Sequence, residues 1–292
     1  MEIRTLRYFL AVAKEENMSR AAETLHVTQP TLSKALKSLE EELGQKLFTR
    51  KSFSIRLTEE GLLLRDRAES LVDMADKIEK EFVSLDDITG GELYLGLAES
   101  YQIRHLAKQI KQMKERYPNL HYHITSGDTE QVADKLDRGL LDFAVLAETP
   151  DDKKYDSLAF PSPDVWGLIM RADDPLAKKK AIRVNDMKGL PLFCSGQGWT
   201  HDIPAWAGEH MKDLTLEGSF RLSYNGSVFT REGLGYLLTF RNLVDTSASS
   251  GLTFRPLRPA LTTPLYLVWN RHQTLTPIAE KFLAGLRTAY GA

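Results

Sequence analysis

The apolar positions of the first sixty residues are spaced first as in helices and then as in strands. In the opening segment they share one helical face and predict an amphipathic helix that ends near Asn17: Leu6, Phe9, Leu10 and Ala13. Ser19 can cap a second, short helix through Leu25, and after a tight turn the hydroxyl of Thr28 can cap a third. The pattern therefore predicts helices in close succession.

The third predicted helix has two different faces. Leucines at steps of four and three predict a face buried against the first two helices: Leu32, Leu36, Leu39 and Leu43. Short polar side chains followed by lysines form the other face: Gln29, Pro30, Thr31, Ser33, Lys34 and Lys37. In a helix-turn-helix, the second helix enters the major groove of DNA with its N-terminal residues at the base edges. A solvated helix face is the alternative, but the order of helix, short turn and capped helix favours a DNA-reading surface.

The segment that follows Gly44 alternates with a period of two, which predicts a β-hairpin over residues 47–57. One face carries Phe53, Ile55 and Leu57, and the other carries Ser52, Ser54 and Arg56. Arg50 and Lys51 are expected at the tip of this wing, where they can reach phosphate or the minor groove.

Thr58 is placed to cap a long helix whose first turn is acidic, with Glu59 and Glu60. Apolar residues then repeat at steps of four and three: Leu64, Ala68, Leu71, Ala75, Ile78, Phe82 and Leu85. This spacing predicts a coiled coil through which two chains dimerise, with packing on the helix's own domain as the alternative. A two-fold dimer presents two recognition helices, which predicts a pseudo-palindromic site in double-stranded DNA.

Strands alternate with helices after Gly90-Gly91, which predicts an α/β domain with parallel βαβ units. We expect a winged helix-turn-helix over 1–58, a linker helix over 59–89 and an effector-binding domain over 90–292. The last should consist of lobe I, 90–161 and 265–292, and lobe II, 162–264, with a cleft between them. Ligands of open α/β sheets bind beyond the carboxyl ends of the strands.

Residues just after the predicted strand ends are the candidates for effector binding: Ser100, Tyr101, Gln102, Ser126, Gly127, Thr129, Ser195, Gly196, Gln197, Asn225 and Ser227. N–H groups at the helix N-termini there can bind an anionic or polar ligand. Each residue alone is a plain helix cap about as often as a ligand contact. Serine, threonine, tyrosine and glutamine side chains together favour a small polar or anionic effector.

The composition, with 42% hydrophobic and 27% charged residues in 292, is that of a globular protein. No apolar run is long enough to span a membrane and no secretion signal is visible, so a cytoplasmic protein with no membrane partner is expected. The net charge is −2, but residues 20–58 hold seven lysines and arginines against four glutamates, as a phosphate-binding surface would. The single cysteine, Cys194, excludes an internal disulfide.

Other chemistry is not expected. His121 and His123 share a strand face but lack a third ligand at suggestive spacing, so neither a metal nor any other cofactor is predicted. Cys194 is expected to be a small buried residue rather than a redox sensor, and Lys178-Lys179-Lys180 a solvated loop. No Walker loop, dinucleotide fingerprint or nucleophile elbow is present, so the chain is not expected to be an enzyme.

The stretch MSRAAETLHVTQPTLSKALKSLEEELGQKLFTR, followed by LTEEG, resembles the N-terminal region of LysR-type transcriptional regulators in order and in spacing. GELYLGLAES, LDFAV, MKGLPLF, EGLGYLL and LTPIAEKFL resemble the second half more loosely. The resemblance implies a helix-turn-helix over Met18 to Lys37, with Arg50 as the wing arginine. It also implies a periplasmic-binding-protein-like effector domain with hydroxyls at Ser100, Thr129 and Ser195, homodimers that pair into tetramers, and RNA polymerase as a candidate partner.

A two-state switch is the expected mechanism, in which an effector in the cleft favours one lobe arrangement and so changes how the paired domains sit on DNA. The main alternative is a solute-binding or enzymatic α/β protein whose N-terminal helices serve only for assembly. A third reading is an architectural DNA binder without an effector.

Overall fold

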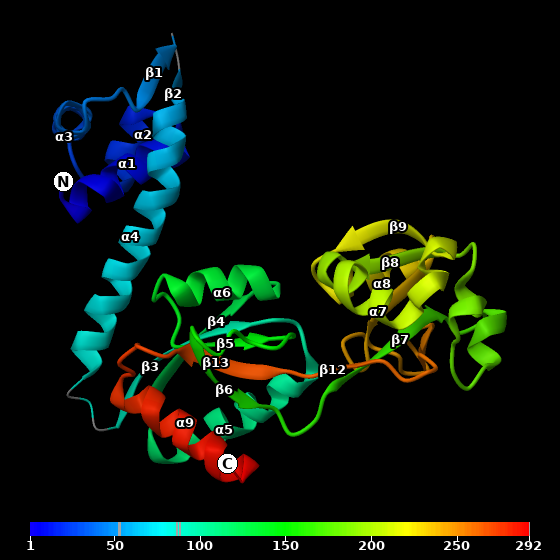
Figure 1. The fold of residues 1–292 in the computed structure, drawn as a ribbon. Helices are drawn as coiled ribbons and strands as arrows, with labels where there is room; N and C mark the ends of the chain where they lie inside the picture. The colour runs from blue at the N-terminus through cyan, green and yellow to red at the C-terminus, as the bar shows by residue number, and fades with distance from the viewer. Residues whose placement is uncertain (52–53, 86, 88, 292) are drawn as a thin grey trace. The chain divides into compact units, whose positions relative to one another are not determined.

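The structure, a computed structural model, describes residues 1–51, 54–85, 87 and 89–291. Its contacts divide the chain into two compact units, Met1–Asp86 and Asp87–Ala292 (Figure 1). Within the described residues, no helix combines the length and the apolar character that a membrane crossing requires.

The N-terminal unit is helical apart from one hairpin. Its elements are α1 (Ile3–Glu15), α2 (Met18–Thr24), α3 (Gln29–Leu43), β1 (Phe48–Lys51), β2 (Ser54–Leu57) and α4 (Glu59–Ser84). The hydroxyl of Thr28 accepts the N–H of Thr31 and caps α3, and Gly44 ends this helix in the left-handed conformation, as predicted. The cap of α2 is Asn17 and not Ser19, because the helix begins two residues earlier than expected.

The core of this unit joins α1, α2, α3 and the start of α4 around Phe9, Leu32 and Leu36, which are almost completely buried. Leu43 was expected on the buried face but is 40% exposed, since it is the last residue of α3. Phe53 and Ser52 of the predicted wing lie outside the described residues. Ile55 and Leu57 do pack against the core, as the alternation predicts.

A close approach between the wing and α4 explains why Gly61 stands in the first turn of that helix. The Thr58 hydroxyl accepts the Gly61 N–H and donates to the Lys46 carbonyl oxygen, so the helix start is bound to the segment before the hairpin. A Cβ at position 61 would lie 2.2 Å from the Leu47 carbonyl oxygen. Only glycine allows this contact without displacement of the backbone.

The seam predicted on α4 is divided between two environments. Ala68 is fully buried in the core of its own unit, and Leu64 packs against that core, so neither is free to face another chain. Ala75 is half-buried. The remaining apolar positions of the seam are exposed: Leu71, Ile78, Phe82 and Leu85.

In the second unit, lobe I is a sheet with strand order β4-β3-β5-β13-β6. Its elements are β3 (Gly90–Leu97), a 3₁₀ helix (Tyr101–Ile103), α5 (Arg104–Arg116), β4 (Asn119–Ser126), α6 (Thr129–Asp137), β5 (Phe143–Leu146), β6 (Tyr155–Ala159), β13 (Tyr266–Asn270) and α9 (Pro277–Tyr290). Leucines of β3 pack with α5 and α9 on one face, and α6 covers the other face through Val132 and Leu136.

Lobe II is a second sheet, with strand order β11-β7-β10-β8-β9 and β12 paired to the start of β7. Its elements are β7 (Asp164–Arg171), β8 (Pro191–Ser195), a π-helix (Gly198–Asp202), α7 (Ile203–Ala207), β9 (Thr215–Phe220), α8 (Ser223–Arg231), β10 (Tyr236–Phe240), β11 (Leu252–Pro256) and β12 (Thr262–Thr263). Short 3₁₀ helices span Pro175–Lys178, Val184–Met187 and Gly208–Asp213.

The chain passes between the lobes twice, and the two crossing segments lie side by side. The Phe160 N–H donates to the Leu265 carbonyl oxygen, and Thr262 pairs with Val165. The predicted two-lobed α/β architecture is therefore present. The sheets are mixed and not wholly parallel, because β13 and β7 run antiparallel to their neighbours.

Candidate functional site

The polar face of α3 is open to solvent in the N-terminal unit. Leu32, Leu36 and Leu39 point into the core, which turns the remaining residues outward. Of the predicted DNA-reading residues, Ser33 is half-buried and the others on α3 are exposed: Gln29, Pro30, Thr31, Lys34 and Lys37. The helix thus holds short polar groups and lysine amines on one rigid, accessible surface.

The two lysines of this face differ in their surroundings. Lys37 Nζ lies 3.5 Å from Glu41 Oε1, one turn further along α3. Lys34 has no ion pair with any described residue. The ammonium of Lys34 is therefore the less compensated charge on the helix, and the better placed to meet a phosphate or a base edge.

Glu40 fixes the wing to α3. Its Oε1 accepts the N–H groups of Leu47 and Phe48, at 2.9 and 3.3 Å, and its Oε2 accepts from Lys46. Burial alone would raise the pKa of Glu40, but these hydrogen bonds hold the pKa below its ordinary value. Arg50 pairs with Ile55 in the register of the hairpin, and Lys51 with Ser54, so both lie where the strand leads into the turn.

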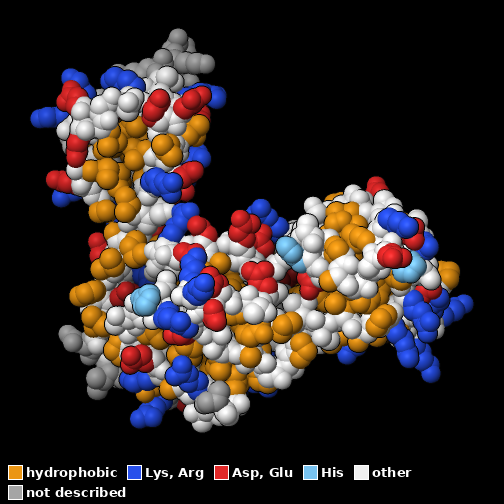
Figure 2. All heavy atoms as spheres, viewed as in Figure 1, with side chains coloured by type: hydrophobic (Ala, Val, Ile, Leu, Met, Phe, Trp, Pro, Cys, Tyr) orange, Lys and Arg blue, Asp and Glu red, His pale blue; other side chains and the backbone are white. Residues whose placement is uncertain are grey.

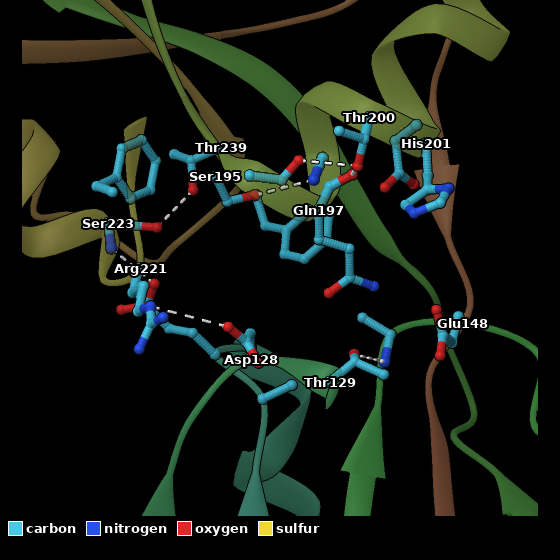
Figure 3. Close-up of a pocket in the computed structure, with 18 of the residues that line it drawn as sticks. Asp128, Thr129, Glu148, Ser195, Gln197, Thr200, His201, Arg221, Ser223 and Thr239 are labelled. Atoms are coloured by element: carbon cyan, nitrogen blue, oxygen red, sulfur yellow. Dashed lines mark hydrogen bonds and ion pairs between the residues drawn. The ribbon is translucent and has the colours of Figure 1, made fainter. Parts of the chain in front are cut away.

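A cavity of about 830 Å³ lies between the two lobes of the second unit (Figure 3). Its volume is in the range of small-molecule sites, roughly 300–1,000 Å³. The segments that follow β3, β4, β5, β8 and β9 line the cavity, so the carboxyl ends of these strands converge there. The predicted residues that line it are Gly127, Thr129, Ser195, Gly196 and Gln197.

Hydroxyl groups hold the cavity wall in place. The Thr129 hydroxyl accepts the Ala147 N–H at 3.3 Å, and the Ser195 hydroxyl accepts the Gly198 N–H at 3.2 Å. Across the floor, the hydroxyls of Ser223 and Thr239 lie 2.7 Å apart. These bonds fix backbone turns from both lobes, whereas the amide of Gln197 extends into the open space in Figure 3.

Two of the polar contacts that cross from one lobe to the other lie at the cavity. The Glu99 carboxylate of lobe I accepts the N–H of Ser223, the first residue of α8, at 2.7 Å. The Asp128 carboxylate caps α6 by accepting the Gln131 N–H, and its second oxygen lies 3.9 Å from Arg221 Nε of lobe II. In both cases a carboxylate of the chain sits at the N-terminus of a helix, where the backbone dipole favours negative charge.

Three predicted residues after β3 belong to the junction of the lobes and do not line the cavity. The buried hydroxyl of Ser100 accepts the Gln102 N–H, and Gln102 donates its side-chain N–H to Asp164 Oδ1 at 3.3 Å. Gln102 also accepts from the Ser162 hydroxyl on the first crossing segment. Tyr101 is 41% exposed and lies beneath the Arg104 guanidinium. The group connects β3 to the point where the chain enters lobe II.

Asp164 is an almost fully buried acid at this junction. Burial raises the pKa of its carboxyl, while hydrogen bonds from Ser100 and Gln102 and the nearby charge of Arg104 act in the opposite direction. The junction therefore contains a group whose ionisation is unfavourable in the folded chain.

The remaining predicted residues also lie off the cavity. Asn225 and Ser227 were expected before the late helix of lobe II, but α8 begins at Ser223, so both are inside it. The Ser227 hydroxyl is buried and donates to the Tyr224 carbonyl oxygen. Ser126 is the exposed last residue of β4, and its neighbour Gly127 lines the cavity in its place.

Sequence reasoning missed several lining residues. Ser223 and Arg221 were overlooked because β9 ends at Phe220 and α8 begins at Ser223, both earlier than the choice of Asn225 and Ser227 assumes. The carboxylates of Glu99, Glu130 and Glu148 were also overlooked. All three follow strand ends closely, and a count of charge at those positions would have found them.

His123 and Cys194, for which the sequence predicts no chemical role, lie in surroundings typical of structural residues. His123 Nε2 lies 2.5 Å from Glu92 Oε2, and its ring stacks on Tyr94. No set of three or more His, Cys, Asp or Glu side chains in the described part of the chain is grouped so that it could hold a metal ion. Cys194 is completely buried, and this burial raises the pKa of its thiol to about 12.

Family models match both parts of this architecture. Residues 3–62 match the bacterial regulatory helix-turn-helix proteins of the lysR family, and residues 87–291 match the LysR substrate binding domain. The chain belongs to the LysR family. The second match alone covers more than half of this LysR-family regulator, and the first includes α3 and the wing.

Individual relatives agree with this assignment. The hydrogen peroxide-inducible genes activator of Pectobacterium carotovorum subsp. carotovorum is 30% identical over 266 residues, which cover 90% of this chain and 82% of that protein. The HTH-type transcriptional regulator BsdA of Bacillus subtilis (strain 168) is 36% identical over 199 residues, 66% of each protein.

Solved structures share the fold. The LysR family transcriptional regulator CbnR has a TM-score of 0.80 at 17% identity and covers 99% of both chains. Full-length CbnR in complex with its target DNA has a TM-score of 0.79 at 18% identity, covering 99% of this chain and 100% of that chain.

Proposed function

We propose that this LysR-family regulator binds a pseudo-palindromic site in double-stranded DNA through residues 1–58, dimerises through 59–89, and is switched by a small molecule held between the lobes of 90–292. The observation that carries the DNA-binding part is the division of α3 into a buried leucine face and an exposed polar face that begins at the helix N-terminus. This is the arrangement that places side chains at base edges in the major groove.

The DNA contacts would come from α3 and from the wing. Gln29, Pro30, Thr31 and Ser33 offer short side chains at the N-terminus of α3, and Lys34 and Lys37 follow on the same face. Arg50 and Lys51 would contact phosphate or the minor groove from the hairpin. Phosphate contacts, which would include that of Lys34, position the protein, and the short polar side chains of α3 supply the sequence preference.

Dimerisation would use the exposed part of α4. Leu71, Ile78 and Leu85 repeat every seven residues, with Phe82, which is 69% exposed, between the last two. Exposed apolar residues at this spacing fit a coiled-coil partner, and a second copy of the chain provides the same surface. Leu64, Ala68 and Ala75 would contribute to the rigidity of the helix more than to the interface.

Pairs of dimers would form tetramers, and RNA polymerase is a candidate partner of the DNA-bound form.

The effector would bind in the inter-lobe cavity, against Gly127, Thr129, Ser195, Gly196 and Gln197. The residues at the lobe junction, Ser100, Gln102 and Asp164, would transmit a change in lobe arrangement to the rest of the chain. A ligand shifts such an equilibrium only through its different affinity for the two arrangements. This mechanism needs no chemical reaction and no cofactor, and it would operate in the cytoplasm, where the DNA is.

Peroxide sensing by disulfide formation is not part of the proposal, although relatives are named for hydrogen peroxide-inducible genes. The chain has one cysteine, so no disulfide can form within it. Burial and the raised thiol pKa also leave Cys194 with very little thiolate, which is the reactive form.

The test is fluorescence anisotropy with duplex DNA from upstream of the protein's own gene, at several salt concentrations. Lys34→Ala should weaken binding, because it removes an uncompensated charge from α3. Loss of one phosphate contact per protomer, thus two per dimer, should lower the slope of log K against log salt concentration by about 2.

Lys80→Ala is the matched control, since Lys80 is an exposed lysine on the later part of α4, beyond its contact with the core. It should bind as the wild type does. If the wild type binds no tested duplex more tightly than random DNA at low salt, the DNA-binding proposal fails. If Lys34→Ala and Lys80→Ala have equal effects, α3 is not the reading helix.

A further inference from the structure

Carboxylates dominate the charged groups around the inter-lobe cavity. Those that line it are Glu99, Asp128, Glu130, Glu148 and Asp202, whereas the positive side chains there are Arg221 and, when protonated, His201. With His201 neutral, the lining therefore carries a formal charge of −4. Figure 2 shows acidic side chains gathered where the two lobes face one another.

Two of these carboxylates occupy the positions that an anionic ligand would take. Glu99 accepts the first N–H of α8, and Asp128 caps α6. Helix N-termini in a cleft ordinarily favour a carboxylate or phosphate of the ligand. Here the chain supplies its own anions at both helices, so an anionic ligand would meet repulsion and would have to displace them.

The other carboxylates are available to a ligand. The side chains of Glu130 and Glu148 have no ion pair or hydrogen bond with any described residue, and both are exposed toward lobe I's side of the cavity. Asp202 faces the cavity from lobe II and accepts a hydrogen bond from the Thr263 hydroxyl at 2.6 Å. The one guanidinium, Arg221, is exposed and already lies opposite Asp128. Lobe I thus contributes four carboxylates to the lining, whereas lobe II contributes the carboxylate of Asp202 and the guanidinium of Arg221.

Trp166, Phe220 and Phe240 also line the cavity. Aromatic faces attract organic cations, and a cleft lined by one sign of charge concentrates ligands of the opposite sign. A metal ion does not fit, because the described carboxylates and imidazoles form no group of three that could coordinate one. An extended organic cation can instead reach carboxylates that lie apart from each other.

From these observations we infer that the effector is a small organic cation with two or more ammonium groups, a diamine or polyamine, whose charges meet Glu130 and Glu148 of lobe I and Asp202 of lobe II. The inference rests on the proposed effector function of the cavity and specifies its ligand class. Binding would offset the repulsion between the lobe I carboxylates and Asp202 of lobe II and so favour the approach of the lobes. The ligand would act as an electrostatic bridge between the lobes.

The experiment is isothermal titration calorimetry on the full-length protein with probes of equal carbon chain and opposite charge. The diamines 1,4-diaminobutane and 1,5-diaminopentane are matched in carbon number by succinate and glutarate, and spermidine is added as a longer triamine. At least one amine should bind, with an affinity that falls as salt is added, and the acids should not. The double variant Glu130→Gln/Glu148→Gln should weaken amine binding about tenfold or more. Glu115→Gln, at an exposed carboxylate of α5 outside the cavity, should leave it unchanged.

Gly196→Trp separates this inference from the proposed function, because a side chain at position 196 meets nothing within 4 Å of its Cβ and would fill the cavity. If an acid binds and Gly196→Trp abolishes that binding, the cavity remains the effector site and the cationic class is wrong. If an amine binds equally well to the double variant, the carboxylates do not recognise it and the inference fails. If no probe of either set binds, the inference is overturned. The DNA-binding proposal is then judged separately, from DNA binding measured on the same preparation.

Discussion

The Glu99 carboxylate and the start of α8 form the contact through which we expect the lobes to be most sensitive to substitution. Glu99 Oε2 accepts the Ser223 N–H at 2.7 Å, across 124 positions of sequence. Glu99→Ala would leave a first-turn N–H of α8 without its acceptor, at a residue that is 2% exposed. An unsatisfied buried donor costs about 1–3 kcal/mol.

Glu99→Gln separates the hydrogen bond from the charge. The glutamine oxygen can accept the same N–H, so the loss is that of a negative charge at a helix N-terminus, about 0.3–1 kcal/mol. Calorimetric unfolding of the full-length protein should therefore rank the variants as wild type, Gln and Ala. For a unit of this size, each kcal/mol corresponds to roughly 2–4 °C in Tm.

Glu130→Ala is the control for this series. Glu130 lines the same cavity, is exposed, and makes no hydrogen bond or ion pair with a described residue, so its loss should change stability by less than about 0.5 kcal/mol. If Glu99→Ala and Glu130→Ala unfold at the same temperature, the Glu99–Ser223 contact does not stabilise the lobes and the reasoning above is refuted.

Three further predictions concern other parts of the chain. Gly61→Ala should destabilise the N-terminal unit by about 1–3 kcal/mol in urea unfolding, because its Cβ would lie 2.2 Å from the Leu47 carbonyl oxygen; a stabilised variant, as helix propensity alone predicts, would contradict the close approach. Since burial raises the pKa of Asp164, the folded chain binds this proton more tightly than the unfolded chain, so stability is lost as pH rises from about 3.9, the unfolded pKa, through the folded pKa. Asp164→Asn should lose less stability than the wild type between pH 4 and 7, and parallel stability curves would show that this carboxyl does not titrate as argued. Finally, the raised pKa of Cys194, about 12, predicts that iodoacetamide at pH 8 labels the native protein far more slowly than the urea-unfolded protein; equal labelling rates would mean that the thiol is accessible.

Much of the N-terminal unit could be predicted because its determinants are local. The Thr28 and Thr58 caps, the left-handed Gly44 and the leucine face of α3 all depend on residues within one or two turns of each other. Periodicity also predicted the long helix that begins at Glu59. It could not show that Ala68 is buried by α1 and its neighbours while Phe82 is exposed, because both positions fit the same repeat.

The effector domain shows the limit of the same method. Strand and helix order along the chain was enough to expect two lobes and a cleft at the strand ends, and Gly127, Thr129 and Ser195 do line the cavity. The start of α8 was placed too late along the chain, which was enough to select Asn225 and Ser227 in place of Ser223. Helix starts are poorly defined by pattern when, as for α8, no side chain caps them locally.

Local sequence thus determines caps, turns, buried faces and the order of the elements, since the interacting groups are close together along the chain. The charge of the cavity depends instead on residues brought together from both lobes, and only folding places the Glu99 carboxylate at the first turn of α8. Electrostatic interactions depend on distance in space and on burial. The sequence therefore indicated helix N-termini open to an anion, whereas the folded chain places its own carboxylates at the N-termini of α6 and α8, on which the inferred cationic effector depends.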